Sequence, residues 1–84
     1  MKYRVEIKRS AEKELDALRG HFFDRIRDKI LSLEEIPRPF GVQKLHGRDA
    51  HRVRVGDYRI LYTVDDDAKL VEIASVLHRR EAYR

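Results

Sequence analysis

The sequence contains no cysteine, no His-x-x-x-His pair, and only four glycines among its 84 residues. Without cysteine the chain can form neither disulfides nor a thiolate nucleophile, a composition that fits a reducing cytoplasm. The missing His-x-x-x-His spacing argues against a zinc site. The scattered glycines provide no phosphate-cradling loop. Because no apolar run approaches the length of a membrane span or signal-peptide core, we expect a cytosolic protein without metal, cofactor or membrane contact.

The composition is that of one small folded domain spanning residues 1–84. Apolar residues make up 42% and charged residues 40%, and the formal net charge is +4. The apolar residues are strongly patterned, which argues against disorder. We find no internal repeat, low-complexity segment or linker. The basic excess favours a polyanionic partner such as nucleic acid, or an acidic protein.

The first half of the chain predicts one strand and two helices. Residues 1–8 alternate apolar and polar side chains, as in a half-buried strand. Ser10 is a favourable N-cap for a helix that runs to about residue 19, and Gly20 is expected to end it. A second helix is predicted over 21–35, with Phe22 and Phe23 in the core. The short connection predicts an antiparallel helical hairpin.

The second half predicts four strands. Residues 42–45 form a short candidate strand after the two prolines, and residues 69–77 form an apolar strand expected inside the sheet. Between them, two alternating runs meet at Gly56-Asp57, a typical two-residue hairpin turn. The three aspartates at 65–67 are interpreted as a solvated turn and not as a metal site. The order β-α-α-β-β-β-β predicts an α+β fold in which the N-terminal strand and a mostly antiparallel four-stranded run complete one sheet packed on the helical hairpin.

The central hairpin separates an apolar face from an arginine face. Counting outward from the turn places Val53 opposite Ile60, and Arg54 opposite Arg59. Arg52 shares the face of those two arginines. Directly opposed like charges destabilise a sheet by roughly 0.2–1 kcal/mol. The face is therefore either a solvated surface or a place where an anion binds.

The remaining polar residues suit metal-independent cleavage of RNA. In RNA the 2′-OH is itself the nucleophile, so the protein must align it, stabilise charge on the phosphoryl oxygens and exchange protons. Guanidinium groups match a phosphate in geometry and charge. Four residues are candidates for proton transfer: Lys44, His51, His78 and Tyr83.

Three segments resemble the RelE/ParE toxin superfamily, on the RelE side. They are KLHG at 44–47, RVRVGDYRILYTVDD at 52–66 and VEIASVLHRREAYR at 71–84. The resemblance implies a RelE-like toxin of a type II toxin–antitoxin system. It also implies ribosome-dependent mRNA cleavage in the A site, leaving a 2′,3′-cyclic phosphate and a 5′-OH. The implied partners are a RelB-like antitoxin, mRNA and the ribosome, with operator DNA contacted only through the antitoxin complex.

The resemblance also implies roles for individual residues. Arg59 matches the arginine that binds the scissile phosphate, and Arg79 the one that stabilises charge or protonates the leaving group. Tyr83 matches the terminal tyrosine that stacks on or orients the substrate nucleotide and assists proton transfer. His78 is an acid/base candidate, because Arg52 stands where well-known members carry a lysine and arginine cannot act as a base. We expect RNA or ribosome contacts from Lys44, Arg52, Arg54 and Arg80.

Several alternatives remain open from the sequence. Arg80 can replace Arg79, and Lys44 can face only solvent. His46 and His51 are interpreted as loop histidines without a role, and Tyr58 and Tyr62 as hairpin core. The same fold also supports a ParE-like inhibitor of DNA gyrase, or a non-catalytic relic that only binds its antitoxin.

Overall fold

The computed structural model describes residues 2–46 and 49–82. The predicted order of strands and helices is confirmed, and a short C-terminal helix is added to it. The elements are β1 Arg4–Ile7, α1 Arg9–Asp16, α2 Gly20–Ser32, β2 Gln43–Lys44, β3 Ala50–Val55, β4 Tyr58–Asp65, β5 Leu70–His78 and α3 Arg79–Ala82.

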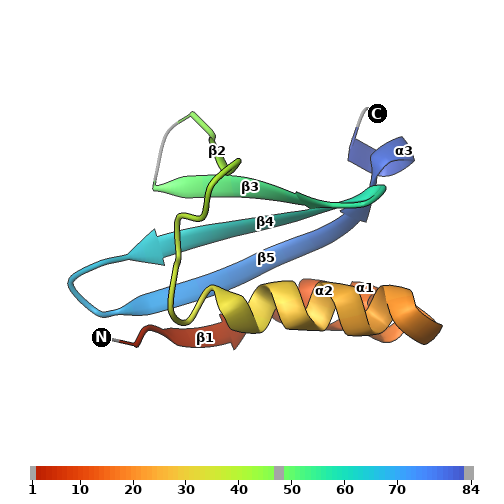
Figure 1. The fold of residues 1–84 in the computed structure, drawn as a ribbon, viewed down its shortest axis with the longest axis horizontal. Helices are drawn as coiled ribbons and strands as arrows, with labels where there is room; N and C mark the ends of the chain where they lie inside the picture. The colour runs from red at the N-terminus through yellow and green to blue at the C-terminus, as the bar shows by residue number, and fades with distance from the viewer. Residues whose placement is uncertain (1, 47–48, 83–84) are drawn as a thin grey trace.

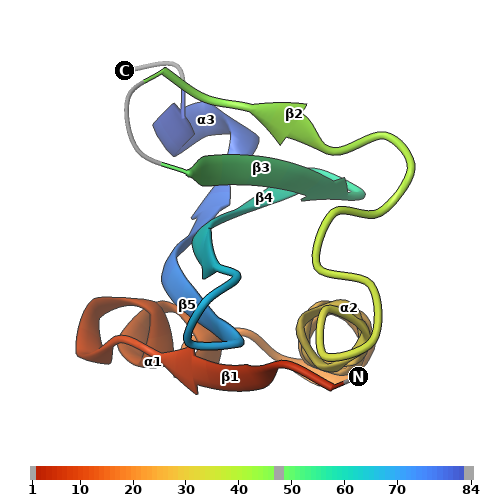
Figure 2. The same cartoon turned by 90° about the vertical axis from the view of Figure 1, so that its left-hand side faces the viewer.

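The strands form one five-stranded sheet in the order β1-β5-β4-β3-β2. All neighbouring strands are antiparallel except β1 and β5, which are parallel. The last strand therefore lies inside the sheet, as its apolar sequence predicts. Figure 1 shows α1 and α2 along one side of the sheet, and Figure 2 shows β2 and β3 curving away from these helices.

The core lies between the two helices and the sheet. Each helix contributes apolar residues one turn apart, which places them on one face: Ala11 and Leu15 from α1, Ile26 and Ile30 from α2. They pack in one cluster with the apolar face of the hairpin, as predicted. The sheet residues of this cluster are Val53, Ile60, Tyr62, Val64, Val71, Ile73 and Val76.

Several local predictions about the helices were wrong. Ser10 is not the N-cap; Lys8 is, and the Ser10 hydroxyl instead donates to the Ala74 carbonyl oxygen at 3.0 Å. Gly20 does not end the first helix but begins α2, with φ of 60°. Phe22 is 44% exposed, so only Phe23 packs partly against the core. These differences arise because tertiary partners override the local capping and periodicity signals.

Candidate active site

The central hairpin has the register predicted from its turn. Val53 is opposite Ile60, and Arg54 is opposite Arg59. Gly56 occupies the turn with φ of 58°, a conformation that favours glycine over residues with a side chain. Since side chains alternate along a strand, Arg54 and Arg59 lie on the face opposite the apolar core.

Three arginines line one small pocket at the end of this hairpin. The pocket has a volume of about 150 Å³ and is lined by Arg54, Gly56, Asp57, Arg59 and Arg79. The first four come from β3, its turn and β4, and Arg79 is the first residue of α3. The structure thus brings together residues from the hairpin and from the end of the chain.

Arg59 is the buried member of the pocket lining. It is 4% exposed, and its cross-strand neighbours are Arg54 on β3 and Leu77 on β5. Arg79 is largely exposed. A guanidinium group keeps its proton at any physiological pH, so this pocket remains positive. Fixed, fork-shaped cations of this kind can bind a phosphate and stabilise extra charge on its oxygens.

Asp57 is a pocket residue whose position in the sequence indicates only a turn. Its carbonyl oxygen accepts a hydrogen bond from the Arg79 N–H at 2.7 Å. Its Oδ1 lies 3.9 Å from Nη1 of Arg79. Asp57 therefore ties the start of α3 to the hairpin turn and adds one carboxylate to the pocket. No local signal indicates this role, because the partner lies more than twenty residues along the chain.

His78 is not brought to the arginine pocket. It is opposite Tyr58 on β4, and its ring meets that of Tyr58 edge-on at 5.2 Å between centroids. Tyr58 packs against the core, so His78 lies on the helix-facing side of the sheet. Its Nδ1 accepts a hydrogen bond from the Arg80 N–H at 3.2 Å. The geometry therefore argues against the expected acid/base role of His78 in this pocket.

The expected RNA-contacting residues fall in different places. Arg52 shares the face of Arg54 and donates to Oε1 of Gln43. Lys44 is opposite His51, which places it on the other face and towards the far end of β3. Arg80 is exposed beside Arg79. Tyr83 lies outside the described residues.

His51 is not a loop histidine, contrary to the prediction. It lies in β3 with 2% exposure, its ring stacks on Tyr62 at 5.5 Å, and its Nε2 lies 3.4 Å from Oδ1 of Asp49. Burial lowers the pKa of His51 below its usual value, despite the opposing effect of Asp49. The neutral imidazole is thus part of the core, far along the sheet from the arginine pocket.

An ion-pair cluster next to His51 holds the loop after α2 onto the sheet. Arg38 contacts Asp49 at 2.5 Å and Asp66 at 3.1 Å. The hydrogen bond from Arg38, followed by that from Tyr3, lowers the pKa of Asp66 to about 2. These contacts give Asp66, in the acidic turn, a structural role. Across residues 2–46 and 49–82, no group of three or more His, Asp or Glu side chains is arranged to hold a metal ion.

The chain is similar to known toxins of type II toxin–antitoxin systems. A family model described as "ParE toxin of type II toxin-antitoxin system, parDE" matches residues 5–83. A protein of Methanocaldococcus jannaschii, described as a candidate RelE1 toxin, is 32% identical over 88 residues, which cover 100% of this chain and 98% of that protein.

None of the helices in the described part of the chain is long and apolar enough to cross a membrane.

Solved structures of similar fold come from archaea and bacteria. The archaeal RelE–RelB complex from Pyrococcus horikoshii has a TM-score of 0.81 and 30% identity, covering 94% of this chain and 97% of the other. The RelBE2 toxin–antitoxin complex of Mycobacterium tuberculosis has a TM-score of 0.81 and 26% identity, with 94% and 100% coverage. The isolated Escherichia coli RelE toxin has a TM-score of 0.78 and 26% identity, with 96% and 95% coverage.

Proposed function

This chain belongs to the RelE/ParE family of toxins of type II toxin–antitoxin systems, and we propose that it is a ribosome-dependent endoribonuclease that cleaves mRNA in the A site. The observation that carries the proposal is the pocket in which Arg54, Arg59 and Arg79 converge. Three cations around about 150 Å³ suit one phosphodiester group and its developing charge.

In the proposed reaction the 2′-oxygen of the RNA attacks the adjacent phosphorus. The bond from phosphorus to the 5′-oxygen breaks, which leaves a 2′,3′-cyclic phosphate and a 5′-OH. The 2′-OH loses a proton and the leaving oxygen gains one. Arg59, buried and permanently charged, stabilises the phosphoryl oxygens, and Arg79 stabilises charge on the leaving oxygen.

Proton transfer needs a group other than these arginines, because guanidinium does not release its proton. We assign it to Tyr83, as the family resemblance implies. Asp57 is the carboxylate in the pocket lining and can also accept a proton. Arg52, Arg54 and Arg80 are proposed to contact RNA, and Lys44 to contact RNA or the ribosome away from the pocket.

We further propose that a RelB-like antitoxin neutralises this toxin in the cytoplasm. The similar structures from P. horikoshii and M. tuberculosis are toxin–antitoxin complexes. An acidic or amphipathic helix of the antitoxin would cover the basic face or displace the end of the chain, and operator DNA would be contacted through the complex. Titration of the antitoxin into a cleavage reaction without loss of cleavage would contradict this mode of inhibition.

Primer extension on mRNA from translating ribosomes tests the proposed activity. The wild-type chain should produce discrete cleavage within the A-site codon, and Arg59→Ala should lower cleavage by about 10²–10³-fold and relieve growth inhibition while the protein remains folded. Full cleavage by Arg59→Ala would show that the arginine pocket does not take part in cleavage.

A second function is favoured by one observation, the match to the ParE family model. A ParE-like toxin would act on DNA gyrase and not on mRNA. Inhibition of gyrase supercoiling by the purified chain, with mRNA left intact on ribosomes, would establish this alternative.

A further inference from the structure

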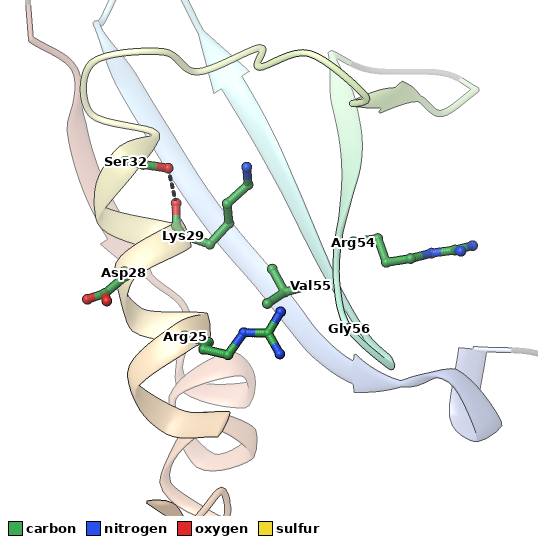
Figure 3. Close-up of a pocket in the computed structure, with 7 residues that line it drawn as sticks. All are labelled: Arg25, Asp28, Lys29, Ser32, Arg54, Val55 and Gly56. Carbon is green, nitrogen blue, oxygen red and sulfur yellow. Dashed lines mark hydrogen bonds between the residues drawn. The ribbon is translucent and has the colours of Figure 1, made fainter. Parts of the chain in front are cut away.

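A second, larger groove lies on the other side of the hairpin turn, between α2 and β3. It has a volume of about 520 Å³. Arg25, Asp28, Lys29 and Ser32 of α2 line one wall, and Arg54, Val55 and Gly56 line the other (Figure 3). Val55 is the one large apolar side chain in this lining. The groove therefore lacks the apolar anchors that a protein partner normally buries.

Two cations of α2 extend into this groove. Arg25 and Lys29 are four residues apart, so they lie one turn apart on the same helix face, with a rise of about 6 Å between them. Figure 3 shows both side chains reaching towards β3, whereas Asp28, which also lines the groove, directs its carboxylate away from β3. The Arg25 Nη1 atom lies 3.6 Å from the position that a Cβ atom would occupy at Gly56.

The cations of α2 differ in their pairing with carboxylates. Arg27 pairs with Asp24 at 3.6 Å and with Asp28 at 3.3 Å. Within the part of the chain that the structure describes, neither Arg25 nor Lys29 has a carboxylate at salt-bridge distance. Like charges at this spacing slightly destabilise a helix, so a bound anion would stabilise the arrangement.

The groove and the arginine pocket meet at the hairpin turn. Gly56 and Arg54 line both of them. Gly56 has no side chain to separate the two cavities, and its positive φ favours glycine at that position. Figure 3 shows the Arg54 guanidinium extending to the side of β3 away from α2. Basic side chains thus follow one another around the end of the hairpin.

We infer that the groove between α2 and β3 binds backbone phosphates of the RNA strand whose scissile phosphate enters the arginine pocket. The inference rests on the proposed function and identifies a second contact region for that substrate. Arg25 and Lys29 would neutralise neighbouring phosphates without reading the bases. An acidic segment of a protein is the competing occupant; it is disfavoured because Val55 is the one apolar side chain in the lining that such a segment could pack against.

The double variant Arg25→Ala/Lys29→Ala tests this inference. The probe is a single-stranded RNA with 2′-O-methyl groups throughout, which the proposed chemistry cannot cleave. Log affinity falls as log salt rises, and losing two phosphate contacts should make this slope less steep by about 1.4. Binding at low salt should weaken on the order of tenfold. Alanine is a good helix former, so α2 should be retained; a thermal melt checks this.

The matched control is Lys2→Ala/Arg4→Ala. It removes the same net charge, one lysine and one arginine, from exposed side chains that pair with Glu35 and Glu6 outside the groove. Its salt slope should stay close to that of the wild type. Equal losses in both double variants would mean that only net charge matters, and would overturn the inference.

Other outcomes separate the groove from the proposed cleavage. The inference is overturned if Arg25→Ala/Lys29→Ala binds the RNA probe as tightly as the wild type does, or if the wild type does not bind the probe measurably. Either result counts even if the wild type cleaves mRNA. Unchanged RNA binding with lost affinity for the purified antitoxin assigns the groove to a protein and also overturns it. A wild type that binds the probe through the groove but cleaves no mRNA supports the groove and contradicts the cleavage.

Discussion

Replacing Arg59 by methionine separates the charge of this residue from its packing. The side chain is 4% exposed, so its methylene stem is part of the folded interior. Methionine keeps an unbranched stem of similar length and removes the charge. Arg59→Ala removes both. The two variants should therefore lose the same activity but differ in stability.

The magnitude follows from burial. Alanine loses about two to three buried methylene groups at about 0.8 kcal/mol each, roughly 2 kcal/mol. Both variants lose the guanidinium together with its contacts, so that loss cancels when the two are compared. We expect Arg59→Met to be more stable than Arg59→Ala by this packing contribution of roughly 2 kcal/mol. A chain of this length has about 4–13 kcal/mol of stability, so both should fold.

Two assays check the prediction together. Urea unfolding gives the stability differences, and cleavage of mRNA on stalled ribosomes gives the activity, which should fall about 10²–10³-fold in both variants. Arg4→Met is the control, since Arg4 is exposed and pairs with Glu6 on β1. Cleavage by Arg59→Met at near the wild-type rate, or a loss of stability well above that of Arg59→Ala, would refute the assignment of a catalytic charge at this position.

Two further predictions concern Tyr62 and Asp57. The Tyr62 hydroxyl donates to the Pro37 carbonyl oxygen at 2.7 Å, and burial raises its pKa from 10 to about 12. Between these pH values the Tyr62 hydroxyl loses its proton in the unfolded chain and keeps it in the folded chain. The free energy of unfolding, measured by urea titration, should therefore fall by about 2–3 kcal/mol as pH rises from 10 to 12. The Tyr62→Phe variant should lack this decrease. Asp57→Asn removes the carboxylate beside Arg79 while keeping the backbone contact; because both side chains are 63% exposed, stability should change little. Affinity for RNA should then rise and the cleavage rate fall by roughly tenfold if Asp57 positions Arg79, whereas a parallel fall in both would argue against positioning.

The hairpin was predictable because its information is local. Gly56 between two alternating runs fixes the turn, and counting outward then pairs Arg54 with Arg59. The division into an apolar and an arginine face follows from strand alternation alone. The α+β class likewise follows from the order of short periodic segments.

The side of the sheet occupied by His78 could not be predicted in the same way. A register shift between Leu61 and Tyr62 inserts one extra residue of β5, so that Arg59 faces Leu77 and Tyr58 faces His78. Counting back from the acidic turn without this bulge places Leu77 opposite Tyr58 instead. One residue of shift exchanges the two faces of a strand, and the sequence carries no clear sign of it.

The other differences depend on partners far along the chain. Ser10 donates to a carbonyl oxygen 64 residues away, and the contact between Asp57 and Arg79 joins a turn to the last helix. His51 is buried where its ring stacks on Tyr62 and its Nε2 lies near Asp49, which is paired with Arg38. Such contacts form only in the complete fold, so local propensity gives no guide to them.

The parallel pairing of the first and last strands has a consequence for synthesis of the chain. Arg4 pairs with Leu70 and Ile7 with Ile73, so the strand made first has no neighbour in the sheet until the strand made last is available. Arg79, which completes the arginine pocket, is translated later still. A polypeptide that ends before Arg79 therefore lacks one cation of the pocket, and one that ends before β5 also leaves β1 without a partner strand. The arginine pocket can form only after all five strands have been synthesised.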